Sequence, residues 1–310
     1  MAVIAVAGGN GKLGLAIVEG LVATGQHQVI ILTRDASNME SKASAQLITV
    51  NYDDVSELVS VLESNGIEMV ICTINPISSF EPELNLIQAA EKSSCTKRFI
   101  PSAWGNKLTK EACSYFYLAP GKLSVLAALD ATSLEWTAVH TGLFMDYWLM
   151  PKIKSYMPPL TFAIDIPHRA AAIPGSGNVP VVFTYSFDVA RYVVRLVGLP
   201  NWGRDSFVVG DKVTWNEFLG FAEEATGAKF TVAFDSMEKL KSGRVSELPG
   251  HKEMMHGSPL EDKLHAAWSG ACRLCEDGGF DFEASPLLHE SFLENKPRKV
   301  RESLLEAWRD

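Results

Sequence analysis

The sequence contains no apolar segment long enough to cross a bilayer, which takes about 20 residues. The longest apolar stretch beyond the N-terminus, Leu143–Met150, is interrupted by Asp146 and followed by Pro151. The apolar residues at the N-terminus end at Ala7, which makes them too few for the apolar region of a secretory signal, and no basic residues precede them. No Asn-x-Ser/Thr sequon is present. These absences predict a soluble, cytoplasmic protein that has no membrane partner.

Cysteine is also scarce. Five Cys among 310 residues form an odd and sparse set, unlike a disulfide framework, which favours a reducing compartment. Cys272 and Cys275 form one C-x-x-C pair, with His256 and His265 upstream. Their spacing matches no standard zinc finger or ribbon, so we expect a helical segment here and no metal site.

Positive charge is in deficit. The sequence has 28 Lys and Arg against 37 Asp and Glu, a net charge of −9, and no cluster of Lys and Arg. Binding to a nucleic-acid backbone depends on counterion release by such residues, so the chain is a poor candidate for a nucleic-acid partner. A small anionic ligand needs only a local positive pocket. Since 47% of the residues are hydrophobic, the chain is apolar enough to fold around a core.

Short β-branched runs alternate with helical periodicity through the first half of the chain. The expected strands are Ala2–Ala7, Gln28–Leu32, Leu47–Val50, Met69–Ile74, Arg98–Pro101 and Trp136–His140. The expected helices are Lys12–Thr24, Asp54–Ser64, Glu81–Ser93 and Lys122–Ala131, the second opened by a capping box at Asp54 and Glu57. This alternation predicts βαβ units and an α/β fold built on a doubly wound parallel sheet.

Proline interrupts the alternation after Pro151. A loop-rich stretch is expected over 158–180, then a strand at 179–184, a helix at 187–197, a strand at 206–209, a helix capped by Thr214 and Glu217, and a strand at 229–234 within a mostly helical remainder. We expect a first domain at 1–155, to which 179–210 returns a strand and a helix. A smaller, mostly helical domain for substrate binding is expected at 156–178 and 211–310.

A glycine-rich loop follows the first expected strand. The segment from Gly8 to Gly14 has the pattern G-x-x-G-x-x-G and opens the first helix. Glycine lets the chain turn sharply and approach a pyrophosphate, which the N–H groups at the start of the helix then bind. We therefore expect a Rossmann fold whose dinucleotide is held by Gly8, Gly11, Lys12, Leu13 and Gly14. The alternative is a tight turn without a ligand.

The end of the second strand distinguishes the two dinucleotides. An Asp or Glu there binds the ribose hydroxyls of NAD, whereas an Arg binds the 2′-phosphate of NADP. Thr33 and Arg34 precede Asp35, which favours NADPH as the cofactor. In the alternative, Asp35 binds the ribose and Arg34 points to solvent. Further cofactor contacts are expected at Asp53, Thr73 and Asn75.

The segment after the fifth strand carries a family resemblance. Residues Arg98–Gly105 read R-F-I-P-S-A-W-G. Together with the glycine loop, this segment resembles the NmrA-like and isoflavone-reductase-like families of atypical short-chain dehydrogenases/reductases, most of all their filamentous-fungal members. Segments at 172–175, 187–190, 209–217 and 247–249 fit the same pattern. The resemblance covers nearly the whole chain and implies a cofactor contact at Ser102.

The resemblance also implies a catalytic Lys at the start of the helix before the sixth strand, which is Lys122 here. Ordinary short-chain dehydrogenases use Tyr-x-x-x-Lys, but Leu118 stands at the Tyr position, which leaves Tyr115 and Tyr117 open as proton donors. The same role can be argued without the family. The positive end of the helix dipole lowers the proton affinity of a Lys at a helix start, and such a Lys beside a nicotinamide can polarise a carbonyl group or deprotonate a phenol. The alternative is an ordinary surface Lys.

Aromatic residues follow the sixth strand, at the sheet edge where open α/β folds bind ligands. Phe144, Tyr147 and Trp148, with Trp104, are expected to form a wall for a flat, apolar small-molecule substrate. The same spacing also suits a core helix. His140 ends the sixth strand, where it either hydrogen-bonds the substrate or has a structural role.

These features predict an NADPH-dependent oxidoreductase that reduces a conjugated C=C or C=O bond of an aromatic or polyketide-like molecule in secondary metabolism. Two alternatives stay open: a dinucleotide-sensing regulator of the NmrA type that catalyses nothing, and a redox-neutral isomerase or cyclase. Lys122 favours an enzyme, because such sensors tend to lack this residue. A homodimer is also left open.

Overall fold

The computed structural model describes residues 1–35, 45–77, 79–255, 261–282 and 296–309. The strands are β1 Val3–Ala7, β2 Gln28–Thr33, β3 Gln46–Thr49, β4 Met69–Cys72, β5 Arg98–Ile100, β6 Glu135–Trp136, β7 Ala138–His140, β8 Leu143–Phe144, β9 Ile164–Asp165, β10 Ala170–Pro174, β11 Pro180–Thr184, β12 Asp205–Phe207, β13 Asp211–Thr214 and β14 Thr231–Asp235. The α-helices are α1 Lys12–Thr24, α2 Val55–Ser64, α3 Glu81–Lys92, α4 Ala119–Asp130, α5 Ser186–Val197, α6 Trp215–Thr226, α7 Met237–Lys241, α8 Pro249–Met255, α9 Glu261–Glu276 and α10 Val300–Trp308, with 3-10 turns η1 Glu111–Ser114 and η2 Met145–Trp148.

The chain forms two compact units. The first holds Met1–Trp104, Pro120–His140 and Ser186–Val208, and the second holds Gly105–Ala119, Thr141–Tyr185 and Val209–Asp310. Of the segment 179–210, which the sequence pattern returned to the first domain, helix α5 and strand β12 lie in the first unit and strand β11 lies in the second. Residues 105–119 and 141–155 group with the second unit, whereas the sequence pattern placed both segments in the first domain.

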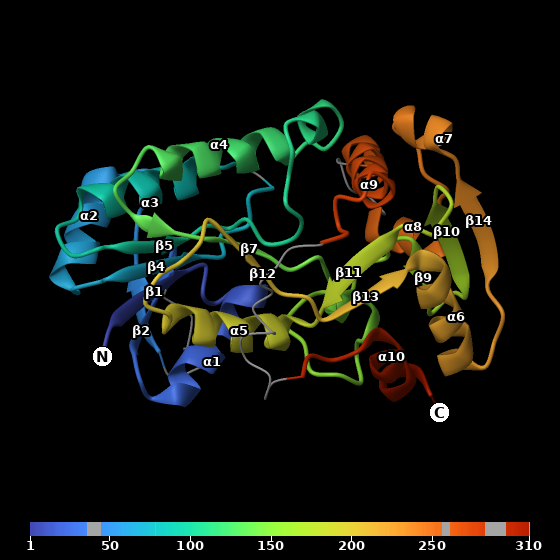
Figure 1. Ribbon diagram of the computed structural model, residues 1–310, viewed down its shortest axis with the longest axis horizontal. Coiled ribbons are helices and arrows are strands. Elements are labelled where there is room, and N and C mark those ends of the chain that lie inside the picture. The colour runs from blue at the N-terminus through green and yellow to red at the C-terminus, as the bar shows by residue number, and fades with distance from the viewer. Residues whose placement is uncertain (36–44, 78, 256–260, 283–295, 310) are drawn as a thin grey trace. The chain divides into compact units, whose positions relative to one another are not determined.

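A six-stranded sheet forms the centre of the first unit. Its order is β3-β2-β1-β4-β5-β6, and every pair is parallel, which confirms the doubly wound α/β fold. Helices α1 and α5 pack together on one face of the sheet, and α2, α3 and α4 cover the other (Figure 1). Ala7 of β1 is in register with Leu32 of β2 and Cys72 of β4. The loops that follow these strands therefore begin at the same sheet edge.

Local sequence signals fix the helix starts. The carboxylate of Asp54 accepts hydrogen bonds from the N–H groups of Ser56 and Glu57, as an N-cap should. The expected capping box is only half formed, because the Glu57 carboxylate accepts instead from Asn51 N–H. Thr214 and Glu217 form the complete box that opens α6.

The expected strand at 136–140 is divided at Thr137. Strand β6 extends the six-stranded sheet, whereas β7 pairs with β12 in a separate two-stranded sheet. Thr137 is the point of exchange: its N–H donates to Phe99 O on β5 (3.3 Å), while its hydroxyl contacts Ser206 Oγ on β12 (2.8 Å). The hydrophobic pattern of a strand does not show which strand it pairs with, so the sequence predicted one continuous strand here.

The second unit contains strands that the sequence pattern did not predict. It has two three-stranded sheets, β14-β10-β9 and β13-β11-β8, beside helices α6–α10. Strands β9 and β10 lie within the proline-rich stretch.

The core of the second unit includes an aromatic cluster in which Trp148 contacts the rings of Phe183, Trp215 and Phe218.

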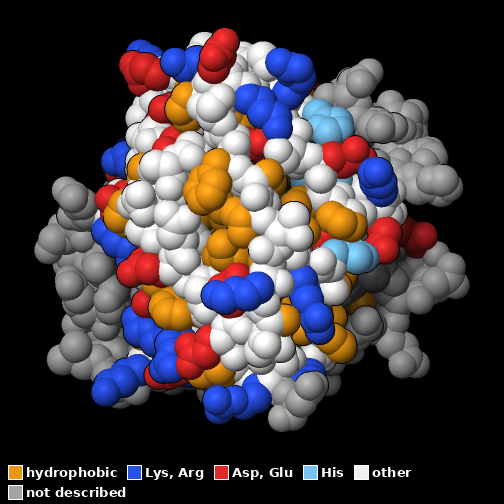
Figure 2. Space-filling view, turned by 90° about the vertical axis from the view of Figure 1, so that its right-hand side faces the viewer, with side chains coloured by type: hydrophobic (Ala, Val, Ile, Leu, Met, Phe, Trp, Pro, Cys, Tyr) orange, Lys and Arg blue, Asp and Glu red, His pale blue; other side chains and the backbone are white. Residues whose placement is uncertain are grey.

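Charge is distributed rather than concentrated on the face drawn in Figure 2. Its described basic and acidic side chains are interspersed, so this face shows no extended positive patch of the kind that a phosphate backbone requires. Within the described residues, no helix combines the length and the apolar character needed to cross a membrane.

Candidate functional site

The glycine loop is a close-packed turn at the carboxyl edge of the sheet. Gly8 has φ +76°, and its carbonyl accepts a hydrogen bond from Gly11 N–H at 2.8 Å. A Cβ atom on Gly14 would lie 2.5 Å from both Gly8 O and Thr73 Oγ1. The loop therefore has no room for a side chain at Gly14, and Thr73 packs directly against it.

Helix α1 begins without a side chain that caps it. Its N-cap is Gly11, which makes no side-chain cap hydrogen bond, and its first turn contains no acidic residue. The N–H groups at Lys12 and Leu13 thus start the helix beside a glycine backbone, with the positive end of the helix dipole behind them. This arrangement fits a pyrophosphate, and Lys12 is exposed next to it.

The end of β2 is exposed. The Thr33 hydroxyl is engaged by the backbone of Asp35, to whose carbonyl it donates at 3.1 Å. Arg34 and Asp35 are both exposed, and the positive charge of Arg34 lowers the pKa of Tyr52, although burial raises that pKa more strongly. Arg34 is therefore near Tyr52. The residues at 36–44, which follow this strand end, lie outside the described part of the chain.

The other expected cofactor contacts are spread along the same edge. Asp53 and Asn75 are exposed, and Asn75 Oδ1 accepts a hydrogen bond from Ile77 N–H. Ser102 is buried, and its hydroxyl donates to Ile74 O at 2.9 Å. Its N–H donates to the carboxylate of Glu83 at 2.6 Å. The polar groups of Ser102 are thus engaged within the protein.

Lys122 lies in the first turn of α4 and is partly buried. Its Nζ donates a hydrogen bond to Trp104 O at 2.9 Å, and the Trp104 indole N–H donates to Cys72 O at 2.9 Å. Burial lowers the pKa of Lys122 to about 8, and the negative charge of Glu83 opposes that effect. An ammonium group tethered in this way does not behave as an ordinary surface Lys.

Glu83 is a buried carboxylate near Lys122 that the sequence analysis missed. Its side chain is only 3% exposed, and burial raises its pKa to about 7. A signal was present in the sequence: Glu83 precedes Leu86, Ile87 and Ala90 by three, four and seven residues, which puts a carboxylate on the apolar face of α3. Buried carboxylates are rare unless paired, so the pattern pointed to a partner.

The residues expected at the substrate divide between the two units. Phe144, Tyr147 and Trp148 belong to the second unit, and Trp104 and His140 to the first. Tyr147 and Trp148 line a small pocket together with Trp308. Burial raises the pKa of the Tyr147 phenol, so this hydroxyl stays protonated.

Two of these residues have structural roles in this fold. His140 is 2% exposed and its Nε2 is 2.7 Å from Asp205 Oδ1. Trp148 is 3% exposed, and its indole N–H donates to Ile164 O at 2.9 Å within the aromatic core. Both side chains are thus engaged within the fold, and their roles toward a substrate stay predictions.

The tyrosines near Lys122 in sequence belong to the second unit. Arg273 lies 3.9 Å from the ring centroid of Tyr115, and burial and Asp277 raise the pKa of that phenol to about 12. Tyr117 is 53% exposed, and the partial burial of its side chain also raises its pKa. Neither phenol is a stronger acid than usual.

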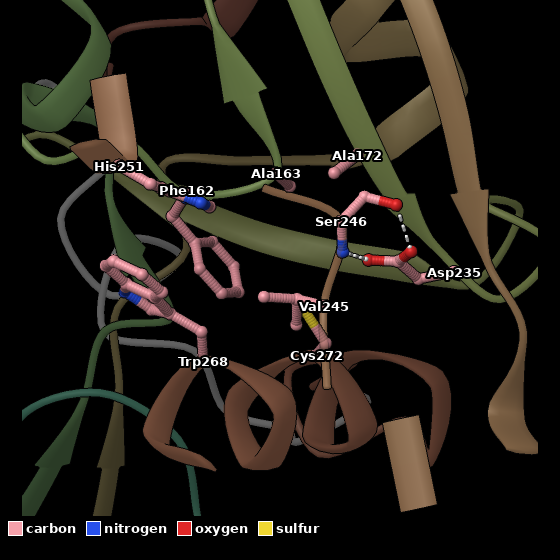
Figure 3. Close-up of a pocket in the computed structure, with 9 residues that line it drawn as sticks. All are labelled: Phe162, Ala163, Ala172, Asp235, Val245, Ser246, His251, Trp268 and Cys272. Carbon is pink, nitrogen blue, oxygen red and sulfur yellow. Dashed lines mark hydrogen bonds between the residues drawn. The ribbon is translucent and has the colours of Figure 1, made fainter. Parts of the chain in front are cut away.

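A smaller pocket lies within the second unit (Figure 3). His251 stacks on Trp268 on one side, with ring centroids 4.1 Å apart. On the other side, Asp235 accepts hydrogen bonds from Ser246 N–H and Oγ and from Lys239 Nζ, each at 2.7 Å. The carboxylate is thus satisfied within the unit.

The C-x-x-C pair lies in α9, in a helical segment as the sequence predicted. Cys272 and Cys275 are buried free thiols, and burial raises the pKa of each. Across the described residues, no group of three or more His, Cys, Asp or Glu side chains is arranged to hold a metal ion. His256 lies outside the described residues.

Comparison with known proteins agrees with this architecture. A sequence model of the NmrA-like family matches residues 1–264. The chain belongs to the NmrA-like family. The NmrA-like chain is 34% identical over 268 residues to Oxidoreductase BOA1 of Botryotinia fuckeliana, covering 86% of this chain and 87% of that protein.

Solved structures share the fold. The binary complex of leucoanthocyanidin reductase with NADPH from Vitis vinifera has a TM-score of 0.74 at 16% identity, covering 98% of the NmrA-like chain and 99% of the other. AtPrR2 with NADP+ and (+)pinoresinol has a TM-score of 0.74 at 19% identity, covering 98% of each chain. These similarities confirm the Rossmann-type fold expected from the glycine loop and the strand pattern.

Proposed function

We propose that this NmrA-like protein is an NADPH-dependent reductase of a flat, apolar small molecule, acting on a conjugated C=C or C=O bond. The observation that carries the proposal is Lys122: a tethered, partly buried ammonium in the same unit as a glycine loop suited to a dinucleotide. The printed name of BOA1 as an oxidoreductase supports the reaction class. The NADPH and NADP+ complexes of the two structural neighbours support the cofactor.

The residues of the glycine loop and β2 hold the cofactor in this proposal. The N–H groups at Lys12 and Leu13 bind the pyrophosphate, and Arg34 pairs with the 2′-phosphate. Gly8 and Gly14 allow the close approach of the backbone, and Thr73 supports the loop from β4. Bound NADPH supplies the hydride.

Lys122 handles the proton. Its pKa of about 8 keeps Nζ protonated at neutral pH, so the ammonium can donate a hydrogen bond or a proton to an oxygen that gains negative charge. The substrate class in this proposal is a flat, apolar small molecule. The (+)pinoresinol in AtPrR2 is a substrate-sized aromatic molecule that supports this class.

The test measures NADPH binding and NADPH consumption separately. NADPH should bind, and candidate enones and quinones should be screened for consumption of NADPH. With any accepted substrate, Lys122→Ala should lower turnover by about 100-fold or more, the range of general acid–base catalysis. Lys92→Ala, an exposed Lys in the same unit, is the matched control and should retain turnover.

Three outcomes contradict the proposal. Tight NADPH binding without consumption for any substrate class favours the sensor. Conversion of a substrate without consumption of NADPH indicates an isomerase or cyclase. Full turnover by Lys122→Ala removes the role assigned to that residue.

A further inference from the structure

The carboxylate of Glu83 is held inside the first unit by groups from two strands. Ser102 N–H, after β5, donates to Glu83 Oε1 at 2.6 Å. The thiol of Cys72, at the end of β4, is hydrogen-bonded to the same carboxylate and is itself fully buried. These contacts fix the carboxylate on rigid elements, so its charge cannot move away from the site.

Lys122 is tied to the same strand ends. Its Nζ donates to Trp104 O, and the Trp104 indole N–H reaches Cys72 O, each at 2.9 Å. Cys72 therefore connects the carboxylate, through its thiol, and the ammonium group, through Trp104. Both charged groups are fixed by neighbouring strands β4 and β5 of one sheet.

The helices that carry the two charges are locked together at their first turns. Phe80 begins α3 and Gly121 precedes Lys122 in α4. A Cβ atom on Gly121 would lie 2.1 Å from the Phe80 ring, so the ring rests directly on the α4 backbone. This contact keeps Glu83 and Lys122 within electrostatic range.

We propose that Glu83 is a positioning residue for Lys122: its buried carboxylate, when ionised, supplies negative charge that favours the ammonium form of Lys122 at Trp104 O. The proposal rests on the proposed function only for what Lys122 does in catalysis. The charge coupling itself is a property of the protein without cofactor or substrate.

The electrostatics of the pair support this role. Burial raises the pKa of Glu83 to about 7, and the Lys122 charge lowers it; burial lowers the pKa of Lys122 to about 8, and the Glu83 charge raises it. In the part of the chain that the structure describes, the other titratable group that acts on the carboxylate is Cys72, whose pKa burial raises, so its thiol stays neutral. Without Glu83, burial alone would act on Lys122 and release its proton at lower pH.

The experiment measures the titration of Lys122 without NADPH or substrate. The folded protein is labelled with trace acetic anhydride over a series of pH values, and the acetylation of Lys122 is quantified by mass spectrometry. Only the neutral amine reacts, so the rate reports the proton on Nζ. Glu83→Gln retains the shape and an acceptor for Ser102 N–H but removes the charge.

In Glu83→Gln, the midpoint for Lys122 should fall by about one pH unit or more. Glu81→Gln is the matched control, because Glu81 is in the same helical turn but is exposed, and it should leave the midpoint unchanged. A midpoint in Glu83→Gln equal to that of the wild type overturns the proposal. Since no turnover is measured, the result stands apart from the success or failure of the reductase proposal.

A second variant covers the case in which Glu83→Gln does not fold. Lys122→Met leaves Glu83 buried without its counter-charge, so the loss in Tm relative to wild type should be larger at pH 8, where the carboxylate is ionised, than at pH 6. Lys92→Met, at an exposed position of α3, should show no such pH dependence. A loss in Tm that is the same at both pH values contradicts the coupling.

Discussion

The ring of Phe80 occupies the space that a side chain on Gly121 would need: a Cβ there would lie 2.1 Å from Cε2 and 2.2 Å from Cδ2. This contact joins the first turn of α3 to the first turn of α4. Glu83 and Lys122 lie in these two turns. The absence of a side chain at Gly121 therefore allows the carboxylate of Glu83 and the ammonium group of Lys122 to come close together.

Gly121→Ala should therefore destabilise the protein and displace Lys122. Overpacking of this kind costs about 1–3 kcal/mol, which urea unfolding can measure. Gly220→Ala is the control, since Gly220 lies inside α6 with no atom within 4 Å of an added Cβ. That variant should be neutral or more stable by up to about 1 kcal/mol, because Ala is the better helix former. Equal stability of the two variants would show that Phe80 moves aside freely.

Turnover should fall as the pH rises through about 8, because Lys122 has its pKa there and only the protonated form donates. The measurement is kcat/KM across the alkaline range with any accepted substrate. Lys122→Arg retains a positive charge that does not titrate below about pH 12, so its residual activity should lack this decline. A wild-type profile that is flat through the alkaline range would falsify proton donation by Lys122.

Arg34→Gln should weaken NADPH binding more than NADH binding. A hydrogen bond between charged groups contributes about 1.5–3 kcal/mol, so the Kd for NADPH should rise about tenfold or more while that for NADH changes little. Calorimetry with both dinucleotides measures the ratio, and NADH serves as the internal control. An equal loss of affinity for NADPH and NADH would favour the alternative in which Asp35, which is also exposed, binds the ribose.

Trp148 and Phe144 should respond differently to truncation. Trp148 contacts three aromatic rings of the core, so Trp148→Ala should lower the free energy of unfolding by about 3–5 kcal/mol. Phe144 is only partly buried, so Phe144→Ala should cost less stability and should raise KM for the substrate. A large loss of stability in Phe144→Ala without a change in KM would place Phe144 in the core as well.

The sequence alone determined the elements whose cause is local. Helix α1 is bounded as expected at Lys12–Thr24, because a glycine loop precedes it and Gly25, with φ +61°, ends it. The parallel sheet followed from the alternation of β-branched runs and amphipathic helices. The family resemblance also implied a Lys at the start of the helix before the sixth strand, and Lys122 lies in the first turn of α4.

Tertiary structure decided what depends on contacts between distant segments. At Thr137 the chain leaves the pairing with β5 and begins to pair with β12, and the hydrophobic pattern does not show which strand a residue pairs with. The pairing of Glu83 with Lys122 arises because β4, β5, α3 and α4 meet at one sheet edge, where Ser102 and Cys72 hold a carboxylate that the sequence shows only as an acid on an apolar helix face. The charge state of a site depends on burial and on neighbours in space, and those are set when the chain folds.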